Sequence, residues 1–357
     1  MKKILVVLLI LLFPLKVKAI SASSYIVMEM NTNKILESKN MHNVRSVASI
    51  SKIMTAIIAI ESGKLDDTVI VDEIVNKAYG SGIYIKPGEE IKLRDLVYGL
   101  MLRSGNDAAL MIAKYVSNDV DSFVLKMNEK AKEIGMKNTT FNNPSGLDNE
   151  KGNYSTSYDM AILTSYAMKN SEYKKIVGTK KYKFTTNMNS YVFKNKNKLL
   201  HNYKYATGGK TGFTEKARRT LVTTASNNNM DIVVVTLNDG NDFKDHLDLY
   251  EKYFKIYKGY NILKKGNINI TDEKYYKNND LYIKNDFTYP LLETEKNNII
   301  LKFELEKKKE YKDGDVVGKV IVSLGKEKLY EDDVYVNIEK KKKNLWDKIK
   351  DWFSNLW

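Results

Sequence analysis

The sequence predicts an α+β fold in which a mixed first domain precedes a small all-β domain. Runs of alternating apolar residues, bounded by Asn- and Gly-rich turns, occur before residue 40 and again after residue 180. Helical periodicity fills the part between them, and beyond Gly259 only short alternating runs remain. With 357 residues, of which 43% are hydrophobic, the chain is long enough for two such domains.

The first domain begins with a predicted hairpin, formed by strands at 25–30 and 34–37 around a turn at 31–33. A buried helix is predicted at 46–61, because its apolar residues leave only a narrow polar face. Two more helices are predicted at 93–103 and 108–116, separated by the helix-breaking residues 104–107, and a further helix at 158–168.

The rest of the body is richer in strands. The β-rich runs that complete the first domain lie at 182–186, 191–194, 221–225 and 231–237, and a helix at 242–257 closes it. Strands from both ends of the domain therefore enclose a helical block, which is an α+β layout. The second domain has alternating runs at 281–283, 299–305 and 316–322, with turns at 278–280 and 313–315.

Both termini carry segments that differ from the folded body. Residues 1–19 combine Lys2 and Lys3, an apolar stretch at 4–13 and a small-x-small site ending at Ala19, which is the pattern of a cleaved export signal. An uncleaved anchor and cleavage after Ala22 are the alternatives. At 339–357 a basic run precedes an apolar helical stripe with three tryptophans, which suits the surface of an anionic membrane. Docking of this helix on the β domain is the alternative there.

Composition excludes several classes of protein. Cysteine is absent, so disulfides, thiolate metal sites and Cys nucleophiles are excluded. The three histidines, His42, His201 and His246, lack metal-site spacing and are assigned surface or hydrogen-bonding roles, which disfavours a Ser-His-Asp hydrolase. No metal and no organic cofactor is expected. The net charge of +14 favours anionic surroundings, and an export signal makes cell wall or lipid a better partner than nucleic acid.

The strongest chemical signal begins at Ser49. The pattern Ser-x-x-Lys occurs at 49–52, 171–174 and 323–326, but only the first lies on a predicted apolar helix. Lys52 follows Ser49 by one helical turn, so the amine and the hydroxyl share a face. Burial lowers the pKa of a lysine, which allows its neutral amine to activate a serine. The free N–H groups at the start of a helix can receive the oxygen of a reacting carbonyl.

Two further motifs follow in order. Ser104-Gly105-Asn106 lies in the break between two predicted helices, and Lys210-Thr211-Gly212 lies in the segment TGGKTGFTE, which leads toward a strand. Either motif alone is more often a structural turn. The three motifs in series, on a helix, an interhelical loop and a strand, are the set of penicillin-recognising serine enzymes.

The chain resembles the low-molecular-mass penicillin-binding proteins that are serine-type D-alanyl-D-alanine carboxypeptidases. The segments that carry the resemblance, besides the three motifs, are RSVASISKIMTA, GMKNTTFNNPSGLD, YSTSYDMAIL and GGKTGFTEKARRTLVTTAS. The resemblance implies a β-lactamase/transpeptidase-like catalytic domain at 24–258, a small β-rich domain at 259–338 and a C-terminal amphipathic membrane-anchoring helix at 339–357. It implies a place on the outer face of the cytoplasmic membrane, and the oligomeric state stays open.

The resemblance also implies the role of each catalytic residue. Ser49 would attack the carbonyl between the two D-alanines of a peptidoglycan stem pentapeptide, and Lys52 would take its proton. Ser104 would relay that proton to the leaving D-alanine. Asn106 would hold Lys52 and the substrate amide, and Lys210 would supply positive potential that keeps Lys52 partly neutral.

The same resemblance implies that three further residues bind the substrate. Thr211 would bind the terminal carboxylate, and Gly212 would let the substrate lie close along the strand. The backbone N–H groups of Ser49 and Phe213 would form the oxyanion hole. β-Lactam antibiotics would acylate Ser49 as covalent inhibitors.

Several alternatives stay open. A class A β-lactamase shares the motifs, but the chain has SGN where SDN is usual, lacks an evident E-x-x-L-N segment and carries an extra β domain. An endopeptidase that cuts peptidoglycan crosslinks would use the same site, and a noncatalytic penicillin sensor is disfavoured by the intact serine and lysine. Many relatives carry a histidine where this chain has Asn153-Tyr154, so the role of that loop is open. Arg218 and Arg219 are assigned surface or ion-pair roles, although they could bind a carboxylate.

Overall fold

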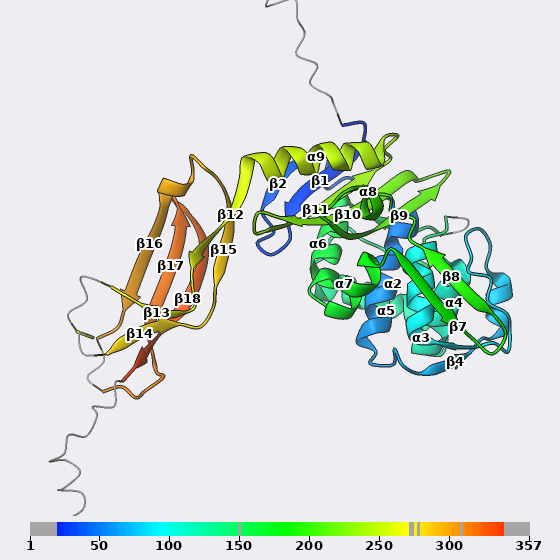
Figure 1. Cartoon of the computed structure of the whole chain (residues 1–357), viewed down its shortest axis with the longest axis horizontal. Coiled ribbons are helices and arrows are strands. Elements are labelled where there is room, and N and C mark those ends of the chain that lie inside the picture. The colour runs from blue at the N-terminus through cyan, green and yellow to red at the C-terminus, as the bar shows by residue number, and fades with distance from the viewer. Residues whose placement is uncertain (1–19, 149–150, 271–274, 277–278, 308–309, 339–357) are drawn as a thin grey trace, which may run out of the picture. The chain divides into compact units, whose positions relative to one another are not determined.

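The computed structural model describes residues 20–148, 151–270, 275–276, 279–307 and 310–338. The predicted export signal at 1–19 and the predicted amphipathic helix at 339–357 lie outside the described residues. The described chain forms two compact units. The first runs to Asn227 and resumes from Asp231 to Phe254, and the second contains Asn228–Met230 and the chain from Lys255 onward. Figure 1 shows helices and strands in the first unit and strands in the second, as predicted.

A five-stranded sheet organises the first unit, in the order β2-β1-β11-β10-β9. Its strands are β1 (Ser24–Glu29), β2 (Ile35–Lys39), β9 (Ala206–Thr214), β10 (Arg218–Asn227) and β11 (Met230–Leu237). β1 pairs antiparallel with β2 and with β11, so Ser24 lies opposite Leu237. This pairing confirms that strands from both ends of the domain build one sheet.

Helices cover both faces of this sheet (Figure 1). Because successive side chains of a strand point to opposite faces, Thr223 and Thr224 of β10 point in opposite directions. Thr223 Oγ1 lies 2.7 Å from Nδ1 of His246 on α9 (Asp242–Ile256), whereas Thr224 Oγ1 lies 4.0 Å from Sδ of Met168 on α6 (Ser157–Met168). The sheet is therefore buried on both sides, and all side chains from Thr220 to Ala225 are buried.

The helical block is packed around α2 (Lys52–Glu61), whose residues from Lys52 to Ile60 are all buried. The helices that surround it are α3 (Leu93–Tyr98), α4 (Asn106–Ser117), α5 (Val120–Glu133), α6 and α7 (Ser171–Gly178), and a short α8 (Leu199–Asn202) precedes β9. The short paired strands of the unit are β3 (Arg45–Ser46) with β6 (Tyr154–Ser155), β4 (Thr68–Ile70) with β5 (Glu90–Lys92), and β7 (Lys181–Thr185) with β8 (Ser190–Lys194). Among the described residues, no helix is long and apolar enough to cross a membrane.

Two predicted helices differ from the structure at their ends. The helix predicted at 46–61 starts too early: Ser46 belongs to β3, and the 3-10 helix η1 (Ala48–Ser51) precedes α2. Ala48 has a φ of 50°, which an α-helix cannot contain. The helix predicted at 93–103 is α-helical only to Tyr98 and continues as the π-helical turn η3 (Gly99–Arg103), which ends at Ser104 with a φ of 67°.

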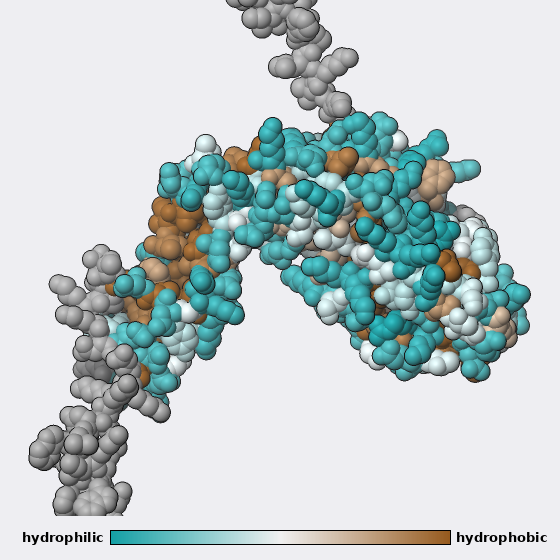
Figure 2. Space-filling view, in the orientation of Figure 1, coloured by the Kyte–Doolittle hydropathy of each residue, from teal (hydrophilic) through white to brown (hydrophobic). Residues whose placement is uncertain are grey.

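The second unit has a core of its own. Its strands are β12 (Tyr257–Leu263), β13 (Gly266–Ile268), β14 (Asp280–Ile283), β15 (Phe287–Leu292), β16 (Ile299–Leu305), β17 (Val316–Leu324) and β18 (Glu327–Asn337). Five strands form a sheet in the order β13-β14-β18-β17-β16, and β12 pairs with β15. Alternate valines of β17 and β18, such as Val320 and Val334, are fully buried. Figure 2 shows hydrophobic residues over the edge strand β16, where the side chain of Ile300 is 53% exposed.

Candidate active site

The first motif lies where η1 passes into α2. Ser49 belongs to η1, and Lys52 is the first residue of α2. The Nζ atom of Lys52 lies 3.2 Å from Ser49 Oγ, donates to Asn106 Oδ1 at 2.7 Å and also donates to the carbonyl oxygen of Ser145. The predicted pairing of a serine hydroxyl with a lysine amine is present, although Ser49 lies in a tighter turn than an α-helix.

Lys52 is fully buried and forms no ion pair with an acidic side chain of the described residues, so its ammonium would be costly there. Burial is the main cause that lowers the pKa of Lys52 well below its usual value, and the positive charges of Lys210 and Lys196 lower it further. Asp107 acts in the opposite direction. The amine of Lys52 is therefore suited to accept a proton from the adjacent hydroxyl.

The second motif lies between η3 and α4. The left-handed conformation of Ser104 turns the chain, and Asn106 begins α4. Asn106 accepts from Lys52 through Oδ1 and donates through Nδ2 to the carbonyl oxygen of Tyr79 at 2.6 Å. Both polar ends of this amide are used, so Asn106 links Lys52 to the loop that contains Tyr79.

The third motif lies on β9, in register with β10. Nζ of Lys210 donates to Ser104 Oγ at 3.1 Å and to the carbonyl oxygen of Thr211 at 2.8 Å. Burial, together with the charge of Lys196, lowers the pKa of Lys210 to about 7. Two buried lysines therefore contact two serines, Lys52 with Ser49 and Lys210 with Ser104.

Gly212 lies directly beside the start of η1. A Cβ atom at this position would collide with Thr220 Oγ1 and lie 3.0 Å from the backbone nitrogen of Ser49. The neighbouring Phe213 is 61% exposed. The absence of a side chain at Gly212 thus allows β9 and the N–H of Ser49 to approach each other.

A cavity of about 370 Å³ joins the motifs. The predicted residues that line it are Ser49, Ser104, Thr211, Gly212 and Phe213. The structure adds five residues that sequence reasoning did not assign to the site, namely Ser81, Lys196, Arg219, Asp242 and Phe243. No motif contains Lys196, and its sequence context does not distinguish it from the neighbouring lysines.

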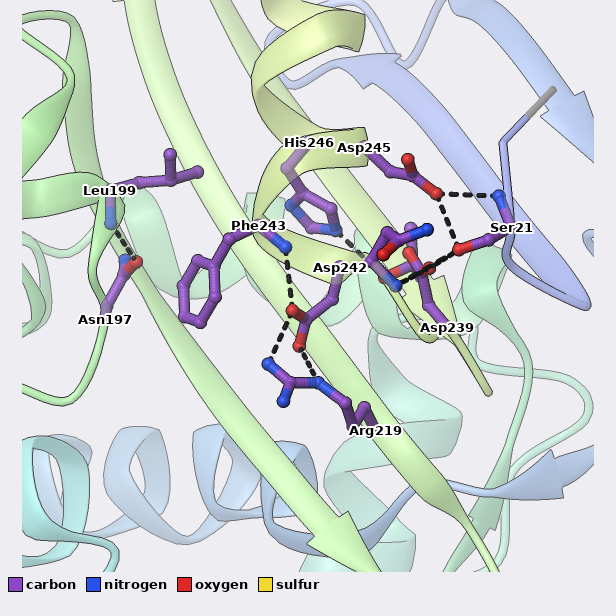
Figure 3. A network of polar contacts seen from close by, with 11 residues as sticks. Ser21, Asn197, Leu199, Arg219, Asp239, Asp242, Phe243, Asp245 and His246 are labelled. Carbon is purple, nitrogen blue, oxygen red and sulfur yellow. Dashed lines mark hydrogen bonds and ion pairs between the residues drawn. The ribbon is translucent and has the colours of Figure 1, made fainter. Parts of the chain in front are cut away.

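Arg219 forms the predicted ion pair, and its partner is Asp242 at the start of α9. The guanidinium donates through Nε and Nη2 to the two carboxylate oxygens at 3.0 and 2.7 Å (Figure 3). This contact is bidentate, which fixes the plane of the guanidinium. The charge of Arg219 is therefore balanced at the wall of the cavity, and the cation of Lys196 has no such carboxylate partner among the described residues.

The loop with Asn153 supports the site through backbone contacts. Ser145, whose carbonyl oxygen accepts from Lys52, is held by Asn143, which accepts from the backbone nitrogens of Ser145 and Gly146 at 3.1 and 2.6 Å. Asn153 is fully buried and bonds to the backbone of Asn142 and Asn143. Asn153 thus has a structural role in this loop.

The other candidates of the sequence lie apart from the cavity. Ser171 is an exposed residue at the start of α7, and Ser323 is half-buried on β17 in the second unit. His246 has the predicted hydrogen-bonding role, because its two nitrogens lie 2.7 and 3.0 Å from the hydroxyls of Thr223 and Thr236. Among the described residues, no group of three or more His, Cys, Asp or Glu side chains could hold a metal ion.

Comparison with known proteins gives matches over both units. A family model described as D-alanyl-D-alanine carboxypeptidase matches residues 13–241, and one described as penicillin-binding protein 5, C-terminal domain, matches residues 257–343. The D-alanyl-D-alanine carboxypeptidase DacF of Bacillus subtilis (strain 168) is 37% identical over 220 residues, which cover 60% of this chain and 56% of the relative. DacA of Escherichia coli (strain K12) is 33% identical over 243 residues, which cover 64% of this chain and 58% of the relative.

A solved structure is similar over more of the chain. Penicillin-binding protein 5 from Haemophilus influenzae aligns with a TM-score of 0.74 at 26% identity, and the alignment covers 90% of this chain and 97% of that structure. In the two curated relatives, by contrast, the matched region spans little more than half of their length.

Proposed function

Because the chain belongs to the D-alanyl-D-alanine carboxypeptidase family, we propose that it is a serine peptidase that removes the terminal D-alanine from peptidoglycan stem pentapeptides. One observation carries the proposal. Ser49 and Ser104 line one cavity, and each hydroxyl lies within 3.2 Å of the amine of a buried lysine. A nucleophile, a base and a proton relay are thereby available in one place.

In the proposed first step, Oγ of Ser49 attacks the carbonyl carbon between the two D-alanines. Its proton passes to the neutral Nζ of Lys52, which the lowered pKa of that lysine favours. The carbonyl oxygen becomes an oxyanion, and the N–H groups of Ser49 and Phe213 would stabilise it. The close approach of β9 to Ser49 at Gly212 supports this arrangement.

In the second step the C–N bond breaks, and the amine of the terminal D-alanine leaves. It needs one proton, which Lys52 gives up and the hydroxyl of Ser104 relays. Lys210, in contact with Ser104, supplies positive potential on the same side of the cavity. The remaining peptide is now an ester of Ser49. A water molecule then adds to the ester carbonyl and restores the serine hydroxyl, which releases the shortened peptide as a carboxylate.

The substrate's terminal carboxylate is assigned to the hydroxyl of Thr211, beside Lys210. Thr211 lines the cavity, whereas Lys210 is 2% exposed, so the hydroxyl reaches the substrate and the ammonium acts from behind it. Asp242 already neutralises Arg219, so Lys210 is the better source of attraction for a carboxylate. Carboxylate binding in turn would raise the pKa of Lys210 above about 7 and keep it protonated during the reaction.

Partners and location follow from the same proposal. β-Lactams, which carry a strained amide and a carboxylate, would acylate Ser49 and occupy the same cavity. The chain would be exported by the segment at 1–19 and held at the outer face of the cytoplasmic membrane by 339–357 on anionic lipid. No metal or organic cofactor takes part in these steps.

Labelling and turnover together test the proposal. The purified protein is treated with labelled penicillin, digested, and the labelled peptide is identified by mass spectrometry, with the expected label on Ser49. Stem pentapeptide and a crosslinked peptide dimer are then supplied in parallel. Release of D-alanine from the pentapeptide with an intact dimer supports a carboxypeptidase. Cleavage of the dimer would favour an endopeptidase. Labelling without turnover of either peptide would favour a sensor, and rapid loss of intact penicillin would favour a β-lactamase.

A further inference from the structure

Two buried carboxylates lie beside the first described residues of the chain (Figure 3). Asp239 and Asp245 are 1% and 6% exposed. The backbone N–H of Ser21 donates to Oδ2 of Asp245 at 2.7 Å, and the Ser21 hydroxyl contacts both Oδ1 of Asp239 and, at 2.9 Å, Oδ2 of Asp245. A hydroxyl has one proton, so it can donate to only one of the two carboxylates at a time.

Within the described residues no positive charge contacts the pair directly, although the charge of Arg219 acts on Asp239 from a distance. Among the described residues, neither carboxylate forms an ion pair with a lysine or arginine, and Arg219 is engaged by Asp242. Oδ1 of Asp239 also accepts from the backbone N–H of Asn241 at 3.1 Å, whereas Oδ2 is buried and, in the part of the chain that the structure describes, forms no hydrogen bond of ordinary geometry. Burial is the main cause that raises the pKa of Asp239, and the charge of Asp245 contributes. Buried carboxylates of this kind are normally paired with a cation.

We propose that Asp239 and Asp245 form a binding site for the α-ammonium group that export creates on Ile20. A signal peptidase would hydrolyse the peptide bond between Ala19 and Ile20 with one water molecule, which leaves a carboxylate on the released segment and an ammonium on Ile20. That nitrogen lies one residue before Ser21, within about 4 Å of the N–H that already bonds to Asp245. The proposal rests on the proposed export, but not on the proposed reaction.

The surroundings of Ser21 select between the two cleavage sites of the export signal. Ala22 is fully buried, and Ser21 contacts both carboxylates, so residues 20–22 are part of the folded unit. Cleavage after Ala22 would remove Ser21 and leave the two carboxylates without their shared partner. Cleavage after Ala19 keeps Ser21 in place and adds the missing cation.

The site lies on the element that also carries part of the cavity. Asp245 is in the first turn of α9, three residues after Asp242, which holds Arg219. An ammonium bound here would hold the start of α9 through its contact with the carboxylate of Asp245. The next residue, His246, already holds α9 to the sheet through Thr223 and Thr236. Removal of the export signal would then stabilise the first unit.

The first test is the N-terminus of the exported protein. The full chain is expressed with its own leader in a bacterial host, the exported form is purified, and its intact mass and N-terminal peptide are measured. A chain that begins at Ile20 is expected. A chain that begins at Ser23, or one that retains residues 1–19, would overturn the proposal.

The second test measures coupling between the N-terminus and the acidic pair. Protein beginning at Ile20 is compared with protein that carries an additional Gly-Ser before Ile20, which moves the ammonium away from its site. The extension is expected to raise the equilibrium constant of urea unfolding by about tenfold, as expected when a buried charge loses its partner. In Asp239→Asn the extension should have little effect, whereas in the control Asp248→Asn, a half-buried carboxylate of α9 that pairs with Lys244 and not with Ser21, the tenfold effect should persist. An equal effect in wild type and Asp239→Asn, or none in wild type, would refute the site.

Discussion

At the scale of single residues, Ser49 differs from Ser171 and Ser323 in its surroundings and not in its pattern. All three serines precede a lysine by three positions, but only the amine of Lys52 is buried beside its serine. We expect Ser49→Ala to abolish covalent labelling by penicillin, because Ser104, the other cavity serine beside a buried lysine, is assigned to proton relay and not to attack on the carbonyl. Ser171→Ala and Ser323→Ala, the matched controls, should label at the wild-type rate. Labelling of Ser49→Ala at an unchanged rate would contradict the assignment.

Burial is the main cause of the lowered pKa of both buried lysines, and the charge of Lys196 adds to it in each case. Its positive charge lowers the pKa of Lys52 and of Lys210, so Lys196→Met removes a charge that disfavours their protonated forms. Both pKa values should therefore rise. The acidic limb of the pH profile of kcat/KM, where Lys52 must lose its proton, should move to higher pH, and so should the basic limb, where Lys210 loses its proton.

The control for this profile is Lys183→Met, which removes the same charge from an exposed position on β7. Its profile should coincide with that of the wild type. A Lys196→Met enzyme with a lower rate but unmoved limbs would show that Lys196 acts by shape or by direct substrate contact instead of by its charge.

The motif residues could be predicted because each occurs in a short, ordered pattern with a chemical reason. Sequence patterns could not predict the roles of Lys196, Ser145 and Asp242, because only the folding of the chain brings these residues to the site. Lys196 follows β8 in the chain, Ser145 contributes a backbone carbonyl that no residue type reveals, and Asp242 acts through Arg219. Sequence reasoning thus proposed the motif residues as the reacting groups, and it did not identify the residues outside the motifs that surround them in the structure.

At the scale of elements, prediction depended on apolar periodicity. The buried α2 and the strands β1 and β11 have strong patterns and were located to within a few residues, apart from the early start of the first helix. The helices α5 and α7 were missed because their compositions are largely polar. The departures at Ala48 and Ser104 are left-handed backbone conformations of non-glycine residues, which no periodicity predicts and which lie at the candidate site.

The loop that contains Gly146 is packed tightly against η1. A Cβ at Gly146 would collide with the carbonyl oxygen of Ala48 and lie 2.6 Å from Ser51 Oγ, and its φ is 79°. Gly63 has a similar φ of 73° with open space around it. A substitution at Gly63 therefore measures the cost of backbone strain without the cost of a collision. Gly63→Ala should lower the free energy of unfolding by about 1 kcal/mol, and Gly146→Ala by roughly 1–3 kcal/mol more.

Urea unfolding measures both values, and penicillin labelling shows the consequence for the site. Because Ala48 precedes Ser49, labelling should slow in Gly146→Ala and stay normal in Gly63→Ala. Equal destabilisation by the two substitutions would mean that the loop can move away from η1 without cost.

At the scale of the whole molecule, the two units have separate cores, and we expect them to unfold separately. Scanning calorimetry should resolve two transitions. Acylation by penicillin stabilises only the native form of the unit that contains Ser49, so it should raise the midpoint of one transition and leave the other unchanged. In Ser49→Ala neither midpoint should move. A single transition that shifts as a whole would contradict two independent units.

The most direct test of the central claim is the release of D-alanine from a stem pentapeptide by the mature protein and by Ser49→Ala. The account predicts stoichiometric formation of D-alanine and tetrapeptide by the wild type and none above background by Ser49→Ala, with both proteins equally folded. Absence of release by wild-type protein that still labels with penicillin at Ser49, or release that persists in Ser49→Ala, would contradict it.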